Sequence, residues 1–494
     1  MNRRMEDNPI RRAVNTGRRL SAGRFSVFAG GGGRLLAAAA LLHVALAVGL
    51  FSVGRAQLAP QLLNRDAIMI VSDSYQYQSG AVRLAEILQN KGLRAWAAEP
   101  ERAHVKLISI QFACLSPLFG YSALSAEPFN LFCYVAILIF VLMLGREVGG
   151  GRAGLLAAGI VALWPTFILH TTQLLKDPLF IAAALALILL VTTWLTRTYS
   201  WVAAVSTSAL MLLAAGLLLL IRARFAVVIF AIVCFGFALL VVRQLMERRL
   251  LYWNLLCPVL LLCAGALAPF YLTAANQKHK QYPSDGSGQP KSVVTGKQAR
   301  GVVAHRSQVP LKPKLPPNGA GRLHATMDRA ALEIGGARYK FNVSWPESGS
   351  GIDRNVEYKN LRSLLLYLPR AFAIGFWSPF PAAWSGEGKS VGRAGRVLSG
   401  AETLLMYLCQ LLALLCLWRE PRCLPAWLLL LITLLGVSML GLVVSNLGTL
   451  YRFRYLFWIL LIILGVKGYE NVMTGRRAGA TDSFERTGEL KEAG

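Results

Sequence analysis

Long apolar stretches alternate with short polar turns along most of the chain, and ten of them approach the ~20 residues that an α-helix needs to cross a bilayer. Charged residues fall mainly between these stretches rather than within them. The pattern predicts an all-α polytopic membrane protein with about ten transmembrane helices. The predicted spans are 35–54, 128–145, 153–172, 178–196, 201–221, 223–243, 251–273, 401–418, 424–446 and 454–468.

Two long polar intervals, 55–127 and 274–400, separate groups of spans and are the places with room for water-exposed structure. The first has a helical pattern of apolar residues after Asp73, so we expect a helical loop. Within it, segment 105–125 is apolar but contains a proline and a glycine that interrupt a helix. We interpret that segment as an interfacial or re-entrant piece rather than an eleventh span.

The second interval changes character along its length. Residues 277–322 hold nine Lys or Arg among many Gly, Ser and Pro, a composition typical of mobile chain. From 323 to 384 we expect a small mixed segment: a short helix at 327–334, strand-like alternation at 339–345, and an amphipathic, aromatic-rich stretch at 361–384 lying at the membrane surface.

Composition agrees with a membrane environment, because 55% of the residues are hydrophobic and only 16% are charged. The net charge of +27 does not indicate nucleic acid, since the basic residues flank apolar spans and form no nucleic-acid-binding motif. Anionic lipid headgroups and phosphates are the expected partners. The eight cysteines lack the paired spacing of metal or redox sites, and we interpret them as small core hydrophobes.

The basic loops predict an orientation. Short loops rich in Lys or Arg fall on one side of the predicted spans together with the arginine-rich N-terminus, so the positive-inside rule places both termini in the cytoplasm. The first span is then a retained signal anchor. The predicted regions are the N-terminus 1–34, a first membrane region 35–273 that includes outer loop 55–127, an outer loop 274–400, a second membrane region 401–470 and a tail 471–494.

Asp73 is the first residue that could carry chemistry. It lies in Ser-Asp-Ser-Tyr, just before a helical pattern in the first outer loop. An acid at a helix start interacts favourably with free amides and the helix dipole, so a helix cap is one interpretation. A catalytic or ligand-binding carboxylate is the other, and the residues alone leave both open.

Cations on the same predicted outer side come from two distant segments. Lys176 precedes Asp177 in a turn between spans, at the depth of lipid headgroups, where Asp177 is also a candidate helix cap. Arg452 and Arg454 begin the last span on the side where the positive-inside rule disfavours arginine. A guanidinium there matches a phosphate bidentately, although arginines reaching toward the membrane surface would explain the composition without a function.

Several stretches resemble a known family. The chain has an acidic motif at Ser72–Tyr75, a helix beginning Gly80-Ala-Val-Arg, the runs SPLFGYSAL and WPTFILHTTQLLKD, and a terminal RFRYLFWILLIILGVKG. In this order they resemble polytopic glycosyltransferases of the C-type fold, including the bacterial protein O-mannosyltransferases and aminoarabinose transferases. The resemblance covers residues 35–270 and 400–470, and is weak over 274–360. One departure is that Ser74 follows Asp73, where many relatives have a second acid.

The resemblance implies a polyprenyl-phosphate-linked sugar as donor, a lipid, glycan or protein acceptor, and an active site on the outer face of a bacterial plasma membrane. It implies Asp73 as general base and Lys176, Arg452 and Arg454 against the donor phosphate. The candidate auxiliary residues are Tyr75, His170, Asp177 and Glu402. No metal ligand set is expected, because the outer side lacks an obvious His or carboxylate cluster, although some relatives hold a divalent cation.

Two other functions stay open. A polysaccharide polymerase or ligase of the O-antigen type also acts on polyprenyl-linked sugars and relies on outer-loop arginines and histidines, and residues 274–360 contain His279, His305 and His324. A transporter or flippase of lipid-linked sugars would need polar groups along a path through the bilayer. The spans are poor in such groups and show no paired broken helices.

Overall fold

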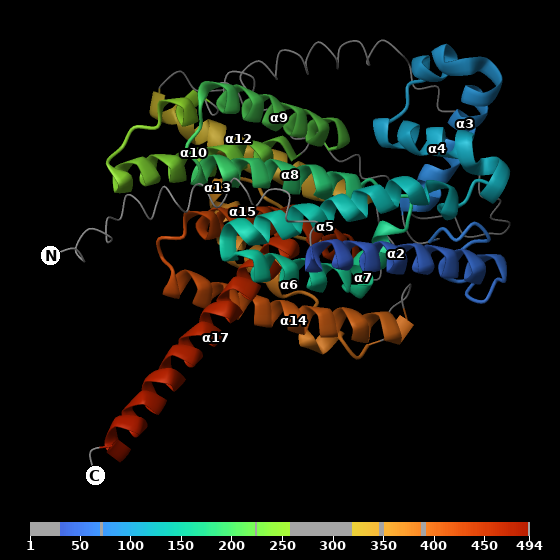
Figure 1. The fold of residues 1–494 in the computed structure, drawn as a ribbon. Helices are drawn as coiled ribbons and strands as arrows, with labels where there is room; N and C mark the ends of the chain where they lie inside the picture. Colours follow the sequence, from blue (N-terminus) through green and yellow to red (C-terminus); the bar gives the residue numbers. More distant parts are fainter. Residues whose placement is uncertain are drawn as a thin grey trace.

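The computed structural model describes residues 30–69, 73–222, 225–256, 319–344, 350–386 and 392–492. Within these residues, eight helices are long and apolar enough to cross a membrane, which confirms a helical polytopic protein (Figure 1). They include α2 (Gly31–Arg55), α5 (Glu127–Gly149), α8 (Asp177–Thr196), α9 (Trp201–Ile221), α10 (Ala226–Glu247), α14 (Gly392–Arg419), α15 (Leu424–Val443) and the first part of α17 (Tyr455–Glu492).

The predicted span 153–172 is not one straight helix. It consists of α6 (Gly151–Ala162) and α7 (Pro165–Thr171), which are bent by 70° relative to each other. The bend falls just before Pro165, because proline has no amide to continue the helix but is well suited to begin a new one. The pair would be a ninth crossing of the membrane if both parts form one span. The bend turns the start of α7 toward α14.

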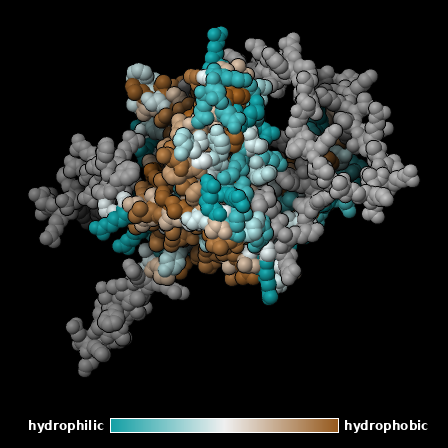
Figure 2. Space-filling view, turned by 90° about the vertical axis from the view of Figure 1, so that its right-hand side faces the viewer, coloured by the Kyte–Doolittle hydropathy of each residue, from teal (hydrophilic) through white to brown (hydrophobic). Residues whose placement is uncertain are grey.

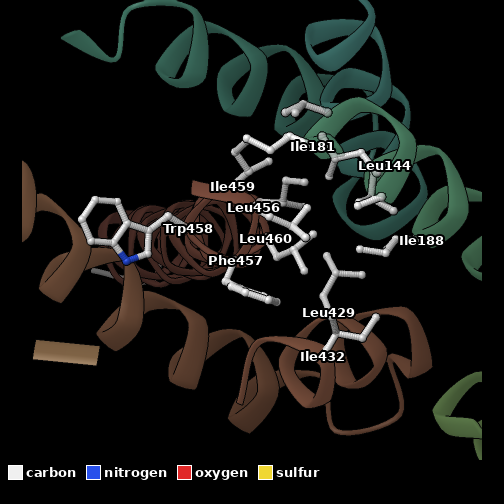
Figure 3. Packing of buried hydrophobic residues seen from close by; sticks show 14 of the residues in the cluster. Leu144, Ile181, Ile188, Leu429, Ile432, Leu456, Phe457, Trp458, Ile459 and Leu460 are labelled. Carbon is white, nitrogen blue, oxygen red and sulfur yellow. The ribbon is translucent and has the colours of Figure 1, made fainter. Parts of the chain in front are cut away.

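Helix α17 forms the centre of the apolar core. Residues 455–466, its first three turns, are buried on all sides, with Phe457, Leu460 and Leu464 fully enclosed. Figure 3 shows this helix among side chains of α5, α8 and α15, including Leu144, Ile188 and Leu429. A helix that is apolar all round must be covered by other helices, so the C-terminal span lies inside the bundle rather than at its edge.

Two further helices lie at one end of the bundle (Figure 1). Helices α3 (Asp73–Ala98) and α4 (Ala103–Phe119), with the 3₁₀ turn η1 (Ala123–Ala126), pack around a small core of their own. α4 is apolar but shorter than the helices of membrane-spanning length, and our interpretation that 105–125 is not a separate span stays a prediction. Figure 2 looks onto this end, where hydrophilic residues gather over the middle beside a hydrophobic flank.

Helices α12 (Gly319–Ser344) and α13 (Leu361–Trp377) pack against α15, and the short turn η3 (Pro381–Ala383) follows α13. α13 approaches α15 closely because Gly375 has no side chain: a Cβ there would lie 2.6 Å from the carbonyl oxygen of Val437. The expected strand-like stretch at 339–345 is wrong for its described part, because residues through Ser344 continue α12. Its alternating aromatic residues lie within a 26-residue helix, whose hydrogen-bond ladder outweighs local strand preference.

Several sequence predictions fall outside the described residues. They are most of the N-terminal region 1–34, the greater part of the span 251–273, and the basic stretch 277–322 up to residue 318. Those predictions stay untested. Within the described chain, successive long helices alternate in direction, so the loops predicted to be cytoplasmic meet at the end opposite α3 and α4. Ion pairs Arg197–Glu147 and Lys467–Glu420 join helix ends there.

Candidate functional site

Five charged residues from four separate segments meet at the α3 end of the bundle, and we call them the aspartate cluster: Asp73, Lys176, Asp177, Arg222 and Arg452. Nη2 of Arg452 donates a hydrogen bond of 2.6 Å to Oδ2 of Asp73. Nε of the same guanidinium lies 3.0 Å from Oδ2 of Asp177, whose other oxygen pairs with Arg222. Arg452 therefore joins two carboxylates that are far apart in the sequence.

Asp73 is the first residue of α3, where free backbone amides favour a carboxylate. The α3–α4 core holds this helix start in place through Tyr77, Ala81 and Leu84, which are buried on one helical face. The Asp73 side chain remains 25% exposed, so a ligand can reach it. Its Oδ1 atom has no hydrogen-bond partner among the described residues. Asp73 thus has one oxygen fixed by Arg452 and one that is without a partner in the described part of the chain.

The turn that carries Lys176 and Asp177 is anchored in the same small core. Leu174 and Leu175 insert their side chains into it. Gln173 accepts a hydrogen bond from the amide of Met69 at 3.0 Å and donates one to the carbonyl of Ala67 at 3.3 Å. These contacts tie the α7–α8 turn to the chain that leads into α3. They explain why Asp73 and Asp177 lie close enough to share one arginine.

Arg222 is held by aromatic rings. Its guanidinium lies 4.2 Å from the ring centre of Phe453 and 5.0 Å from that of Phe180. Cation–π contacts of this kind are favourable, particularly away from water. Only 8% of the Arg222 side chain is exposed, and the same is true of its partner Asp177. The Arg222–Asp177 pair is therefore the buried part of the cluster, whereas Asp73 is the more exposed part.

Arg452 lies on the short helix α16 (Leu447–Phe453). Hydrogen bonds with residues 338, 350 and 352 hold α16 and the residues just before it in place. The amide of Ile352 donates to the carbonyl of Ser445 at 2.8 Å, and the amide of Leu447 donates to Ser350 at 3.0 Å. Arg338, on α12, donates to the carbonyl of Leu442 at 3.0 Å. Residues from the interval 274–400 therefore fix the position of α16, and with it the position of Arg452.

Lys176 is the cation of the cluster with no ion pair among the described residues. Its ammonium lies 5.9 Å from the ring centre of Tyr77 and is half-buried. Burial, helped by the nearby charge of Arg222, lowers the pKa of Lys176 to about 8. The ammonium therefore predominates at neutral pH and loses its proton just above it, and a bound anion favours the ammonium form.

Two neutral neighbours complete this part of the site. Burial, and then the charge of Asp73, raise the pKa of Tyr77 to about 12, so its hydroxyl keeps its proton. Burial and the charges of Lys176 and Arg102 lower the pKa of His104 to about 4, so its imidazole stays neutral. The two rings meet edge to face, with 4.6 Å between their centres.

Because Tyr77 and His104 are neutral, the charge of the site comes from the aspartate cluster alone. Its three cations and two carboxylates give a surplus of positive charge.

A second polar group lies on the other side of α16, and we call it the Glu402 cluster: Thr166, His170, Glu402, Tyr451 and Tyr455. Glu402 accepts hydrogen bonds from the amide of Thr166 at 2.9 Å, from the hydroxyl of Thr166 at 2.6 Å and from the hydroxyl of Tyr451. Nδ1 of His170 donates to the carbonyl of Thr166 at 2.6 Å and lies 3.1 Å from the Tyr455 hydroxyl. Glu402 is buried, with both oxygens occupied.

Arg454 does not join the aspartate cluster. Its side chain is fully buried, its Nη1 donates to the carbonyl of Gly375 at 2.8 Å, and its guanidinium lies 4.5 Å from the ring centre of Trp458. Residues 452 and 454 point to different sides because two positions correspond to about 200° around a helix. Arg454 therefore faces α13 and the core, where a donor phosphate would have to displace packed side chains.

The structure thus brings together Asp73, Lys176, Asp177 and Arg452. Arg454 and Glu402 bind other partners, and His170 bonds within the Glu402 cluster although it lies within electrostatic reach of Asp177 and Arg452. Tyr75 is 55% exposed on the outside of α3. The catalytic and binding roles of all these residues stay predictions. Sequence reasoning missed Arg222, Tyr77 and His104. Arg222 had a signal in the sequence, because it lies in a turn on the predicted outer side, where the positive-inside rule disfavours arginine.

Across the described ranges, no group of three or more His, Cys, Asp or Glu side chains is arranged to hold a metal ion. The two carboxylates of the aspartate cluster face guanidinium groups instead. Comparison with known proteins adds no assignment: the chain matches no family model, and no curated protein or solved structure shows significant similarity to it. The geometry of the site therefore carries the functional argument.

Proposed function

We propose that this protein is a membrane glycosyltransferase that moves a sugar from a polyprenyl-phosphate donor to a hydroxyl or amine of a lipid, glycan or protein acceptor. The proposed site is the aspartate cluster, facing outward from a bacterial plasma membrane, in cell-envelope or exported polysaccharide synthesis. The observation that carries the proposal is the arrangement of Asp73, Lys176 and Arg452. A reachable carboxylate lies beside two cations at the end of a bundle of membrane-length helices.

Asp73 is the proposed general base. Its Oδ1 accepts the proton of the acceptor hydroxyl or amine while the acceptor atom forms a bond to C1 of the sugar. The bond from C1 to the phosphate oxygen breaks, and its electron pair stays on that oxygen. The products are the glycosylated acceptor and polyprenyl phosphate. The hydrogen bond from Arg452 to Oδ2 fixes the carboxylate and leaves Oδ1 to act as the base.

Lys176 and Arg452 are the proposed ligands of the departing phosphate. Arg452 uses Nη2 and Nε for the two aspartates, and within the described chain its Nη1 has no hydrogen bond. The Lys176 ammonium is likewise without an ion pair there. Both therefore have donors left for the negative charge that develops on the leaving oxygen, which is where fixed positive groups accelerate such a reaction. Asp177 and Arg222 hold Arg452 in position.

The experiment is a release assay with the purified protein in lipid nanodiscs. The protein is incubated with a panel of polyprenyl-phosphate hexoses and pentoses and a crude acceptor extract, and polyprenyl phosphate is measured by mass spectrometry, since it is released whichever acceptor is used. Asp73→Asn should lower the release rate about 10²- to 10⁴-fold, the usual contribution of a general base. Asn can still accept the Arg452 hydrogen bond, so folding should persist.

Glu86→Gln is the matched control, because Glu86 is an exposed acid on the same helix. It should leave the release rate unchanged. Release by Asp73→Asn at the rate of the unmodified protein would remove the base from the proposal. Movement of the donor across the bilayer, with no polyprenyl phosphate released by the unmodified protein, would instead favour a transporter.

A further inference from the structure

A hollow lined by charged and apolar residues lies at the end of the bundle opposite the aspartate cluster. It has a volume of about 250 Å³ and lies where α8 and α10 end and α15 begins, with Thr196, Arg243, Arg422 and Leu424 among its lining residues. Helix α8 runs from Asp177 to Thr196, so the hollow is about 30 Å from the aspartate cluster at 1.5 Å per residue. It therefore belongs to the other membrane surface and plays no part in the proposed transfer.

The hollow has a fixed cation. Nη1 of Arg243 donates to the carbonyls of Leu195 and Arg197 at 2.9 and 3.0 Å, and its Nε donates to Glu247 at 2.8 Å. Only 12% of the Arg243 side chain is exposed. No hydrogen bond of its Nη2 to a described residue occurs. The backbone carbonyls that end α8 thus hold the guanidinium in one orientation, with one nitrogen left for a ligand.

The second cation, Arg422, has no ion-pair partner in the part of the chain that the structure describes. Arg422 lies in the exposed turn between α14 and α15 and pairs with no acid of the described chain, whereas its neighbours Arg419 and Glu420 are engaged with Asn471 and Lys467. Two arginines and the single acid Glu247 line the hollow, so one positive charge is uncompensated. Guanidinium groups recognise phosphate oxygens through paired, charge-assisted hydrogen bonds.

The apolar residues that line the hollow favour a phosphate that is attached to a lipid. Leu195, Leu424 and Pro425 line the hollow beside the charged rim, together with Met246, which is 53% exposed. These residues lie at the ends of membrane-length helices, the level at which phospholipid headgroups meet acyl chains. The volume is below the ~300–1,000 Å³ of a pocket for a drug-sized molecule, so it suits a headgroup whose chains remain outside.

We propose that this hollow binds an anionic phospholipid, with the phosphodiester between Arg243 and Arg422 and the acyl chains along Met246 and the adjoining apolar residues. Basic pockets between helices at the membrane surface bind anionic headgroups by the same chemistry. A bound lipid at this place would join the ends of α8, α10 and α15. The proposal is independent of the transfer reaction.

Native mass spectrometry of the purified, delipidated protein tests it, with phosphatidylglycerol as probe and phosphatidylcholine as the zwitterionic comparison. The unmodified protein should retain one phosphatidylglycerol more tightly than phosphatidylcholine. Arg422→Glu should weaken that retention about tenfold or more, because a charge-assisted contact is replaced by repulsion. Arg249→Glu is the matched control: it is exposed at the same membrane surface but does not line the hollow.

Retention of phosphatidylglycerol that is unchanged in Arg422→Glu, or that falls equally in Arg249→Glu, would overturn the proposal. A third arm separates a lipid site from a free-phosphate site. If inorganic phosphate displaces phosphatidylglycerol at equal concentration, the hollow recognises the anion alone and the lipid assignment is wrong. If displacement needs a large excess of phosphate, the acyl chains contribute as proposed.

Discussion

The aspartate cluster and the Glu402 cluster lie on two sides of one short helix, because Tyr451 and Arg452 are adjacent on α16. Each contains a carboxylate bound by a residue of α16. Glu402 is buried and has hydrogen bonds to both oxygens, whereas Asp73 is one-quarter exposed and has hydrogen bonds to only one. A fully bonded buried carboxylate holds helices together. A partly bonded, reachable one retains capacity for chemistry.

Among the substitutions that distinguish the two clusters, Arg452→Gln is expected to lower the release rate most. It removes the cation shared by Asp73 and Asp177 and one of the proposed phosphate ligands, so polyprenyl phosphate release should fall about 10²- to 10³-fold. The fall in release rate should be larger than the fall in the folded fraction, which is obtained from the melting temperature of the variant. Arg454→Gln is the control, because it removes a buried arginine two residues away without touching the cluster.

In Arg454→Gln the unfolding temperature should fall while the activity of the folded fraction stays within about tenfold of the unmodified protein. Equal losses of activity in Arg452→Gln and Arg454→Gln, measured per folded molecule by the release assay, would mean that the cluster has no special part in the reaction.

Glu402→Gln should produce the opposite pattern. The neutral amide presents an NH₂ group to donors from Thr166 or Tyr451, so the free energy of unfolding should fall by about 1–3 kcal/mol. The release rate of the folded protein should change only a few-fold, because Glu402 is not reachable by substrate. Denaturant titration gives the first quantity and the release assay the second. An activity loss as large as that of Asp73→Asn would place Glu402 in the reaction.

At pH 9, the loss of donor binding through deprotonation of Lys176 should be smaller than the loss of activity in Arg452→Gln. Burial and Arg222 lower the pKa of Lys176 to about 8, so its ammonium is present below that pH and is lost above it. A bound phosphate favours the charged form. The donor KM should therefore be constant below pH 8 and rise by up to about tenfold per pH unit above it.

Lys176→Arg keeps a cation that does not lose its proton in this range, so the break near pH 8 should disappear with little loss of affinity at pH 7. Lys176→Gln should also remove the break but weaken donor binding at pH 7. A break that persists in both variants would assign the titration to another group.

Much of the fold could be predicted because the bilayer fixes helix length. Spans such as 178–196 and 201–221 agree with α8 and α9 almost residue for residue. Local patterns were weaker guides elsewhere. The alternation at 339–345 suggested a strand, but contacts such as those of Arg338 with α15 belong to a long helix. The span 153–172 was predicted as one helix, but it bends by 70° just before Pro165, where Thr166 donates hydrogen bonds to Glu402 from the distant helix α14.

The candidate site was predictable only in part. That Asp73 and Arg452 would lie at the same end followed from counting spans, but their hydrogen bond joins residues 379 positions apart and depends on the tertiary fold. The same counting placed Arg454 beside them. Counting spans could not distinguish Arg452 from Arg454, because it predicts the depth of a residue in the membrane and not the side of the helix on which the residue lies. Arg222 was missed because its role depends on Phe180 and Phe453, which only the folded chain brings to it.

The most direct test of the central claim is an experimental structure of the protein with polyprenyl phosphate bound. The phosphate should lie within hydrogen-bond distance of the Lys176 ammonium and of Nη1 of Arg452, with Oδ1 of Asp73 facing the space next to it. A phosphate bound elsewhere, or an aspartate cluster that does not form, would contradict the account.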